Sequence, residues 1–523
     1  MTRSYVTRPL VTRSYVKWSA ATWLGSRAAA GRTGGRVRGS RPAAILLWLL
    51  CGPLAGAQEM ATSASERRAE ILPAATRVSA AIEADELAAH VTYLADHCAG
   101  RKTGTAGEHR AADYLAARLR EAGLLPAGDV GPDGEPTYFQ DADLVERRLG
   151  GGSRLELIAA DGTAIDLEQG RDFRVESALP LEGEFPLAIV ADLADFGGDR
   201  QSLVATAQSH GRARQWASRL ADQPAPPAIL ASGGARLAEG PRPVRLERRS
   251  SLAPTAVITL NRELLARVLA GEFERVRVRI DATIEPVVAR NVVARLHAAP
   301  PAEGNALSEA IVLSAHYDHL GTREPRPDDG PDADLVFDGA DDDASGVAAV
   351  LEIAEALATL PPPARDVLVL LATGEELVSL GTYHYLDQPV VPLDRTVLNL
   401  NFEMVGRPDP LLGPGRLWLT GFERTNLGPL LIERGFDLHP DPRPERRFFE
   451  RSDNYAFARL GIVAQTLSSF GMHTDYHRES DAASTLDYEH MERALAPALE
   501  IARLAATGEL APQWVEGGKP TPR

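Results

Sequence analysis

The second half of the chain alternates between short apolar runs and longer segments that repeat apolar residues at helical spacing. The apolar runs are short enough for buried strands: Ile311–Ser314, Val367–Leu371, Val397–Leu400, Leu417–Thr420 and Ile462–Thr466. The helical segments alternate with them: Ala344–Leu360, Leu377–Leu386, Asn426–Arg434, Ser452–Arg459 and Tyr488–Leu504. This alternation predicts an α/β fold, with a mostly parallel central sheet flanked by helices.

Two further helices are predicted near the start of the same domain. Asp85–Ala95 has apolar residues at helical spacing, and Glu108–Ala122 is strongly amphipathic and ends at Gly123. We assign residues 80–143 to the first part of this domain and residues 290–507 to its second part. Residues 508–523 contain several Pro and Gly residues and are predicted to be a disordered tail.

The pattern changes between residues 144 and 285. Short alternating runs appear there, separated by Gly, Pro and Asp: Arg154–Ile158, Leu187–Val190, Ala228–Leu230, Ala256–Leu260 and Val276–Ile280. Such runs predict a separate, β-rich domain inserted into the chain. No motif within it indicates chemistry, so a lid or a spacer is the expected role.

The first 57 residues differ in composition from the rest. They contain no acidic residue and nine basic ones: Arg3, Arg8, Arg13, Lys17, Arg27, Arg32, Arg36, Arg38 and Arg41. An apolar run, Ala43–Leu50, and the small residues Ala55–Ala57 follow. This order predicts a secretory signal and export to the periplasm or the medium. The apolar run is too short to cross a membrane, so we expect no stable span once it is removed.

The net charge and the cysteine content argue against a nucleic-acid partner and against an internal disulfide. The chain has a net charge of −16, which becomes −25 without those nine basic residues. Nucleic acid is therefore not an expected partner. Only Cys98 would remain after removal of the signal, so the mature chain forms no internal disulfide.

Acidic and imidazole side chains cluster where the predicted strands end. In chain order these are His316 with Asp318, Glu375 with Glu376, Glu403, and the segment His473–His477; Asp342 joins them from the loop after the first strand. In open α/β sheets, sites form at the carboxyl ends of the strands, so these clusters are expected to converge.

The donor set suits a pair of zinc ions. Two imidazoles and three carboxylates hold two zinc ions if one carboxylate bridges them, and a catalytic zinc keeps a position open for water. One carboxylate beside the metals then remains as a general base. The adjacent Glu375 and Glu376 supply a ligand and a base side by side.

Five motifs in this order resemble the di-zinc aminopeptidase family, which includes glutamate carboxypeptidase and transferrin-receptor relatives: HYDHLG, GADDDASG, GEELVSLG, NFEMVGR and DYHRESD. The resemblance covers roughly Ala80 to Ala506. The predicted insert lies where many members carry a protease-associated domain, so the resemblance implies a domain of that kind.

The resemblance also implies a set of metal ligands. His316 and Glu403 would bind one zinc, Glu376 and His477 the second, and Asp342 would bridge both. Two other histidines compete with the last ligand, since spacing alone favours His473 as much as His477, and His319 is a further rival.

Four other residues receive roles from the same resemblance. Glu375 would be the general base that takes a proton from the zinc-bridging water. Asp318 would orient the first imidazole ligand. Tyr476 would hydrogen-bond the tetrahedral oxyanion, and Arg451 is a candidate for contact with substrate or intermediate.

The chain departs from the family pattern at two positions. Asp343 stands where Asn is common after the bridging residue, and Glu403 stands where Asp is more common. Both changes keep an oxygen donor, so catalysis remains expected. On spacing, Asp341 and Asp343 are predicted to cap the following helix or to be solvated.

The sequence therefore predicts a secreted di-zinc aminopeptidase that removes N-terminal residues from peptides. Two alternatives use the same site: a carboxypeptidase acting on acidic dipeptides, which needs a basic pocket, and a glutaminyl cyclase, which usually works with one metal. A non-catalytic binding protein of the transferrin-receptor kind is less favoured, because such relatives lose ligands or the base and none is lost here.

Overall fold

The computed structural model describes residues 82–177, 179–196, 201–217, 219, 225–233, 244–252, 255–300 and 309–521. The predicted signal segment, residues 1–57, lies outside the described residues. Two larger sheets and a two-stranded hairpin make up the strands of the described part.

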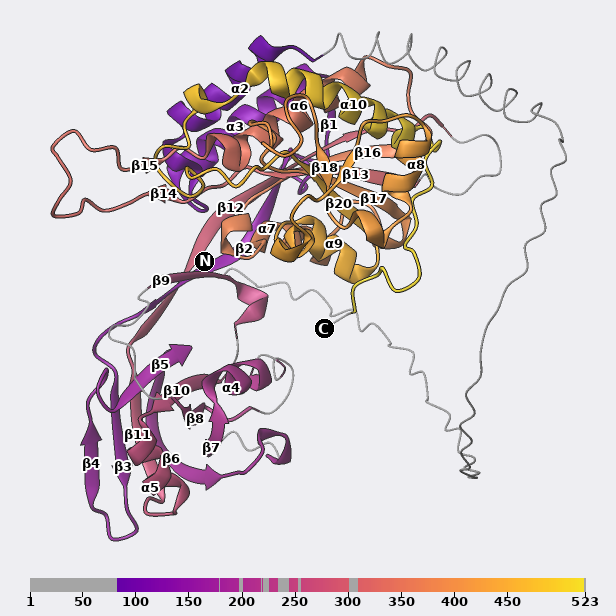
Figure 1. Cartoon of the computed structure of the whole chain (residues 1–523). Helices are drawn as coiled ribbons and strands as arrows, with labels where there is room; N and C mark the ends of the chain where they lie inside the picture. The colour runs from indigo at the N-terminus through magenta and orange to yellow at the C-terminus, as the bar shows by residue number, and fades with distance from the viewer. Residues whose placement is uncertain are drawn as a thin grey trace, which may run out of the picture. The chain divides into compact units, whose positions relative to one another are not determined.

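The larger sheet has ten strands (Figure 1). They are β1 (Leu125–Pro126), β2 (Phe139–Leu149), β9 (Val244–Arg248), β12 (Ala282–Leu296), β13 (Ala310–His316), β16 (Asp366–Ala372), β17 (Thr396–Phe402), β18 (Trp418–Leu419), β19 (His439–Pro440) and β20 (Val463–Ser468). The order across the sheet is β19-β18-β20-β17-β13-β16-β12-β2-β9, with β1 paired to β12.

The centre of this sheet is parallel. β20, β17, β13 and β16 are neighbours that run in the same direction, whereas β18 pairs with β20, and β12 with β16, in the antiparallel sense. β13 and β16 are buried along their whole length, as their unbroken apolar runs predict. Four parallel strands thus end at one edge of the sheet, and all four were expected from the sequence.

Helices cover both faces of the sheet, so the prediction of an α/β fold is confirmed. α2 (Ala84–His97), α3 (Ala106–Glu121), α6 (Gly346–Ala358) and α10 (Tyr488–Ala506) pack over one face, and α7 (Leu380–Asp387) and α9 (Asn454–Leu460) over the other (Figure 1). A seventh helix, α8 (Leu427–Glu433), precedes β19. Among the helices of the described residues, none is long and apolar enough to cross a membrane.

Local sequence explains the two helices that frame the domain. The Thr105 hydroxyl caps α3 by accepting from the backbone N–H of Glu108, and Asp487 caps α10 in the same way through His490. By contrast, α6 is buried on nearly every side because it lies between the sheet and the outer helices α2 and α10. Its sequence, GVAAVLEIAEALA, is correspondingly apolar except at Glu352 and Glu355.

A second sheet of eight strands lies in the predicted insert. Its order is β4-β3-β11-β6-β7-β8-β10-β5, with β3 (Arg154–Ile158), β4 (Ala164–Leu167), β5 (Phe173–Ser177), β6 (Leu181–Ile189), β7 (Leu203–Ser209), β8 (Ala228–Ser232), β10 (Ala256–Leu260) and β11 (Arg275–Ile280), and with helices α4 (His210–Ala217) and α5 (Arg262–Leu269). Alternation is clear in β11, where each arginine is exposed and each aliphatic residue is buried.

The larger sheet extends into the interval predicted as the insert. β2 and β12 pair from Phe139–Val292 to Leu149–Ala282, so the predicted limits at residues 144 and 285 fall within these two strands. β9 also adds to β2 at the edge of the larger sheet. A short hairpin of β14 (Gly321–Thr322) and β15 (Val336–Phe337) completes the strands.

The prediction of a disordered tail over residues 508–523 is wrong up to Thr521. Trp514 forms a β-bridge with Thr425, and its indole N–H donates to the carbonyl of Gly461 at 2.9 Å. Its ring also meets Phe449 edge-on, and Leu510 is buried. The segment has few apolar residues, so its sequence pattern does not predict this packing. Two residues, Leu510 and Trp514, are enough to hold the irregular segment against the folded domain.

Replacing the main anchor is expected to destabilise the domain. Trp514→Ala removes an indole that packs against two core clusters and loses one hydrogen bond. We expect a loss of about 2 kcal/mol in the free energy of unfolding, below the range for a fully buried Trp. Thermal and urea unfolding would measure it, with Val515→Ala at an exposed neighbour as the control. Equal stability of the two variants would contradict the docking.

Candidate metal centre

The predicted site residues meet at the carboxyl edge of the parallel strands. His316 is the last residue of β13, Glu375 and Glu376 follow β16, Glu403 follows β17, and His477 lies in the loop after β20. Asp342 lies in the turn that leads into α6. Convergence of these clusters, expected from strand direction alone, is what the structure shows.

Asp342 lies between two imidazoles. Its Oδ1 is 3.2 Å from His316 Nε2, and its Oδ2 is 3.1 Å from His477 Nε2. His477 Nε2 is also 3.2 Å from Glu376 Oε2. Each oxygen of one buried carboxylate thus faces a different histidine, which is the arrangement that a bridging ligand requires.

A third imidazole, that of His319, approaches the same carboxylates. His319 Nδ1 is 2.8 Å from Glu376 Oε1, and ligand atoms of His319, Asp342 and Glu376 all lie within 4.8 Å of one another. The sequence identified His319 only as a rival of His477. The structure brings both histidines to the cluster, with their rings in edge-to-face contact at 5.8 Å between centroids.

His473 takes a different partner. Its Nε2 is 2.9 Å from Asp341 Oδ2, while Asp341 Oδ1 accepts from the backbone N–H of Gly406 at 2.8 Å. Spacing left His473 and His477 equal, and the structure separates them, because only His477 contacts Asp342. Asp341 is fully buried, so of the two predicted alternatives, capping and solvation, the second is wrong.

Asp343 is buried as well, yet it does cap the helix. Its Oδ1 accepts from the backbone N–H groups of Gly346, at the start of α6, and of Met404, both at 3.0 Å. Burial raises its pKa well above the usual range for aspartate. Asp343 therefore joins the turn that carries Asp342 to the loop after β17.

Asp318 positions the loop of the predicted base. Its Oδ1 accepts from the backbone N–H of Glu375 at 3.0 Å, and its Oδ2 accepts from the Thr103 hydroxyl at 3.1 Å. The same Oδ1 is 3.7 Å from His316 Nδ1, which lies closer to the Asp318 carbonyl, at 3.2 Å. This side chain thus fixes the loop after β16 more directly than it orients the imidazole.

Arg101 is a positioning residue that sequence reasoning missed. It is fully buried and donates to four backbone carbonyls at 2.7–2.9 Å: those of Leu94, Tyr317, Asp338 and Gly339. The guanidinium thereby links the loop after β13 to the turn before Asp342. The sequence alone gives Arg101 no role, since nothing in a sequence separates a buried arginine from a solvated one.

Asp481 holds the other side of the same turn. Its carboxylate accepts from the backbone N–H groups of Asp341 and Asp342 at 3.0–3.2 Å. Arg407 donates to Asp481 at 3.0 Å and to Asp475 at 2.6 Å. The turn is therefore connected to the loop that carries His477. Arg407 is already ion-paired with two carboxylates.

Burial and neighbouring charges shift the pKa values of the clustered side chains in opposite directions. Burial disfavours a charged Asp342, yet the imidazoles of His316 and His477 beside it lower its pKa below the usual range. Burial disfavours a charged His477, but Asp342 and Glu376 raise its pKa to about 10. Burial raises the pKa of Glu403 to about 7 and that of Glu375 well above its usual range. A cation bound here would displace protons from these groups.

The donor set fits a metal site. Several of its buried atoms make no hydrogen bond within the described residues: His316 Nε2, His319 Nε2 and Glu403 Oε2. Buried polar atoms without a partner are costly, and imidazole nitrogen with carboxylate oxygen is the ligand set that zinc accepts. The residues present are therefore chemically suited to the zinc ions that the sequence implied.

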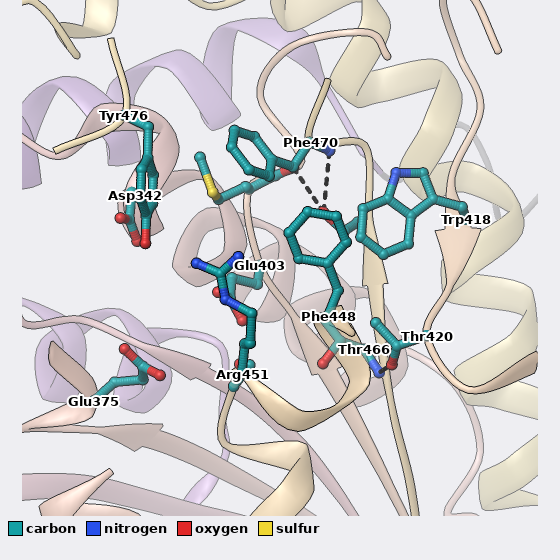
Figure 2. A pocket seen from close by; sticks show the side chains of 13 residues that line it. Asp342, Glu375, Glu403, Trp418, Thr420, Phe448, Arg451, Thr466, Phe470 and Tyr476 are labelled. Atoms are coloured by element: carbon teal, nitrogen blue, oxygen red, sulfur yellow. Dashed lines mark hydrogen bonds between the residues drawn. The ribbon is translucent and has the colours of Figure 1, made fainter. Parts of the chain in front are cut away.

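A cavity adjoins the cluster (Figure 2). Asp342, Glu375 and Glu403 line one side of it, and Tyr476 and Arg451 also contribute. The Tyr476 ring stacks on His477 at 3.9 Å between centroids, and burial raises its pKa. The two residues that the resemblance linked to substrate thus share a cavity with the predicted ligands.

Comparison with known protein families finds a match for the second part of the α/β domain. Residues 291–502 match the description of peptidase family M28. No curated protein matches the chain.

Solved structures with a similar course of the chain include two aminopeptidases. An aminopeptidase from Aneurinibacillus sp. strain AM-1 is 18% identical, with a TM-score of 0.48, and the match covers 83% of this chain and 96% of that one. BSAP, a zinc aminopeptidase from Bacillus subtilis, is 17% identical, with a TM-score of 0.43 and coverage of 82% and 97%. A glutaminyl cyclase from Porphyromonas gingivalis is 13% identical, with a TM-score of 0.38 and coverage of 80% and 98%.

Two histidine variants test the assignment of the last ligand. His477→Ala is expected to lose one zinc per chain, because it removes a nitrogen that faces both Asp342 and Glu376. His473→Ala is expected to keep the metal content of the wild type, since that imidazole faces Asp341. Mass spectrometry under native conditions would give the stoichiometries. Loss of zinc in His473→Ala alone would reverse the assignment.

A conservative change at Arg101 is expected to weaken metal binding. In Arg101→Lys, a single ammonium replaces a fork that reaches three carbonyls in two ligand loops and a fourth, that of Leu94, in α2. We expect zinc affinity to fall about 10-fold to 100-fold, as for other residues that orient ligands. Competition with a chromophoric chelator would measure it, and Arg110→Lys on the exposed side of α3 is the matched control. Equal affinities in the two variants would exclude this positioning role.

Proposed function

We propose that the chain, whose residues 291–502 match peptidase family M28, is an exported, zinc-dependent aminopeptidase that holds two zinc ions. The observation that carries the proposal is the placement of Asp342, whose two oxygens face His316 and His477 at 3.2 and 3.1 Å. In this proposal His316 and Glu403 would hold one ion, Glu376 and His477 would hold the other, and Asp342 would contribute to both.

Glu375 is the proposed general base. Bound zinc would polarise the scissile carbonyl and acidify a water molecule. Glu375 lines the cavity beside Asp342, and its backbone is held by Asp318. Burial raises its pKa, which brings a carboxylate closer to the range in which it takes a proton from water and returns it to the leaving amine.

Tyr476 is the proposed donor to the oxyanion. The ring stacks on His477 and lines the same cavity as Glu375. The loop that carries Tyr476 is held by an ion pair between Asp475 and Arg407. Burial raises the pKa of the phenol, so its O–H remains a donor at neutral pH.

Two alternatives receive less support from the site. Carboxypeptidase action on acidic dipeptides needs several cations around the substrate, yet Arg451 is the only basic residue in the cavity lining and Arg407 is already ion-paired. A binding protein without activity is expected to lack ligands or the base, and this chain retains all of them. Glutaminyl cyclisation remains the second candidate.

Export and the role of the insert complete the proposal. Export rests on the predicted signal segment, residues 1–57. The protease-associated character of residues 144–285 rests on their position between the two parts of the peptidase domain. Because two-domain chains often bind substrate where their domains meet, the proposed role of the insert is to control access to the site.

The first experiment measures hydrolysis of leucyl-anilide with and without a chelator. We expect activity that the chelator abolishes and that added zinc restores. N-acetylleucyl-anilide should not be cleaved, because an aminopeptidase requires a free α-amino group. Cyclisation of an N-terminal glutamine without anilide hydrolysis would favour the second candidate instead.

A variant of the proposed base separates chemistry from metal binding. Glu375→Gln is expected to lower kcat by about 10² to 10⁴ while the zinc content stays at the wild-type value. Glu355→Gln, at an exposed position on α6, is the control and should behave as the wild type. Full activity in Glu375→Gln would assign the base elsewhere.

A further inference from the structure

Burial holds His477 less firmly than the other predicted ligands around Asp342. Its side chain is 34% exposed, whereas those of His316, Asp342 and Glu376 are at most 8% exposed. It lies in a loop, residues 473–481, and its φ of 58° is in the left-handed region that residues other than glycine seldom adopt. Such a backbone conformation persists where surrounding contacts fix it. Contacts made by this His477 loop must therefore hold the imidazole in place.

One such contact joins the His477 loop to the β14–β15 hairpin (Figure 1). The Glu479 carboxylate, two residues after His477, forms an ion pair with Nε of Arg323, which directly follows β14. The other two nitrogens of the guanidinium face Asp329, with Nη1 2.5 Å from Oδ2 and Nη2 3.0 Å from Oδ1. The three side chains are 15–24% exposed, so water screens these ion pairs less than pairs on the open surface. One arginine thus binds a carboxylate of the hairpin and a carboxylate of the His477 loop.

The base of the hairpin is fixed against the rest of the α/β domain. A Cβ atom added at Gly100 would lie 2.4 Å from the carbonyl oxygen of Gly321, so the two backbones are in close contact. Beyond the hairpin, the backbone N–H of Ala340 donates to the carbonyl of Asp481 at 2.9 Å. The segment that contains the hairpin therefore meets the His477 loop at two points, through an ion pair and through a backbone hydrogen bond.

We propose that Arg323 is a positioning residue, which holds the His477 loop so that its imidazole can bind the second zinc ion. The inference rests on the proposed function, because it concerns the same two-zinc site. Arg323 would act through Glu479, since a shift of this ion pair would move the imidazole of His477 relative to Asp342. The ion held by His316 and Glu403 would be affected less, because these residues follow strands that the hairpin does not hold.

The geometry explains why an arginine stands at this position. A planar guanidinium can bind two carboxylates at once and fixes their relative orientation, whereas the ammonium of lysine is a point charge on a flexible stem. Asp329 occupies two of the guanidinium nitrogens and leaves Nε to face Glu479. The acidic stretch that separates the first ligand from Asp342 thereby gains a role, which is to orient Arg323.

The test measures zinc affinity in Arg323→Met, Glu479→Gln and the double variant by competition with a chromophoric chelator. Affinity for one of the two zinc ions should fall about 10-fold to 100-fold in each single variant. The double variant should bind zinc no more weakly than either single variant, because both changes remove the same link. Arg326→Met is the matched control, since it removes the same charge from an exposed position on the same hairpin.

Two further readouts separate positioning from catalysis. Arg323→Lys should bind zinc with intermediate affinity, because an ammonium keeps the charge but loses the fork. An excess of zinc should restore most of the wild-type kcat in Arg323→Met, since a positioning residue changes the occupancy of the site. A kcat that stays low with both zinc ions bound would overturn this role.

Hydrogen exchange in the protein as purified tests the role of Arg323 without zinc binding or turnover. In the His477 loop, the backbone N–H of Arg478 donates to the carbonyl of Asp475 at 2.9 Å, and that of Asp481 to the carbonyl of Arg478 at 3.1 Å. These two amides should exchange about tenfold faster in Arg323→Met than in Arg326→Met. If the wild type holds fewer than two zinc ions, the proposed function fails, and exchange still decides whether Arg323 holds the loop. Unchanged exchange in Arg323→Met, or two zinc ions bound as tightly as in the wild type, would overturn the inference.

Discussion

The carboxylate of Asp342 is buried between two imidazoles, and much of the surrounding structure serves to hold it there. An ionised group in the interior is costly unless opposite charge and hydrogen bonds compensate it. Here His316 and His477 lower its pKa, and Glu376 competes for the second imidazole. Many potential metal ligands lie close together here and form few hydrogen bonds. Bound cations would satisfy these ligand atoms, which supports the proposal of a metal site.

The turn that carries Asp342 is restrained from three directions. Arg101 donates to the carbonyls that precede the turn, and Asp481 accepts from the N–H groups of the turn. Asp343 accepts from the backbone N–H of Met404 and so connects the turn to that loop. None of these restraints is local in sequence. Strands β13 and β17 bring the segments together, and the buried polar contacts then fix the ligands relative to one another.

The sequence predicted the features that depend on periodicity and on strand direction. Strands such as β13 and helices such as α10 followed from apolar spacing, and convergence of the ligand clusters followed from parallel strands ending at one edge. Three-dimensional contact was needed elsewhere. Spacing does not reveal that His473 faces Asp341, that Arg101 is buried, or that Trp514 anchors the tail, because each depends on a partner far away in the chain.

Asp342 and the rings of Trp418, Phe448 and Phe470 line one cavity. The central claim is that Asp342 bridges two metal ions, and the zinc content of purified protein tests it most directly. Native mass spectrometry should find two zinc ions per chain in the wild type and neither in Asp342→Ala. One zinc or none in an active wild-type enzyme, or two in Asp342→Ala, would contradict the bridged site.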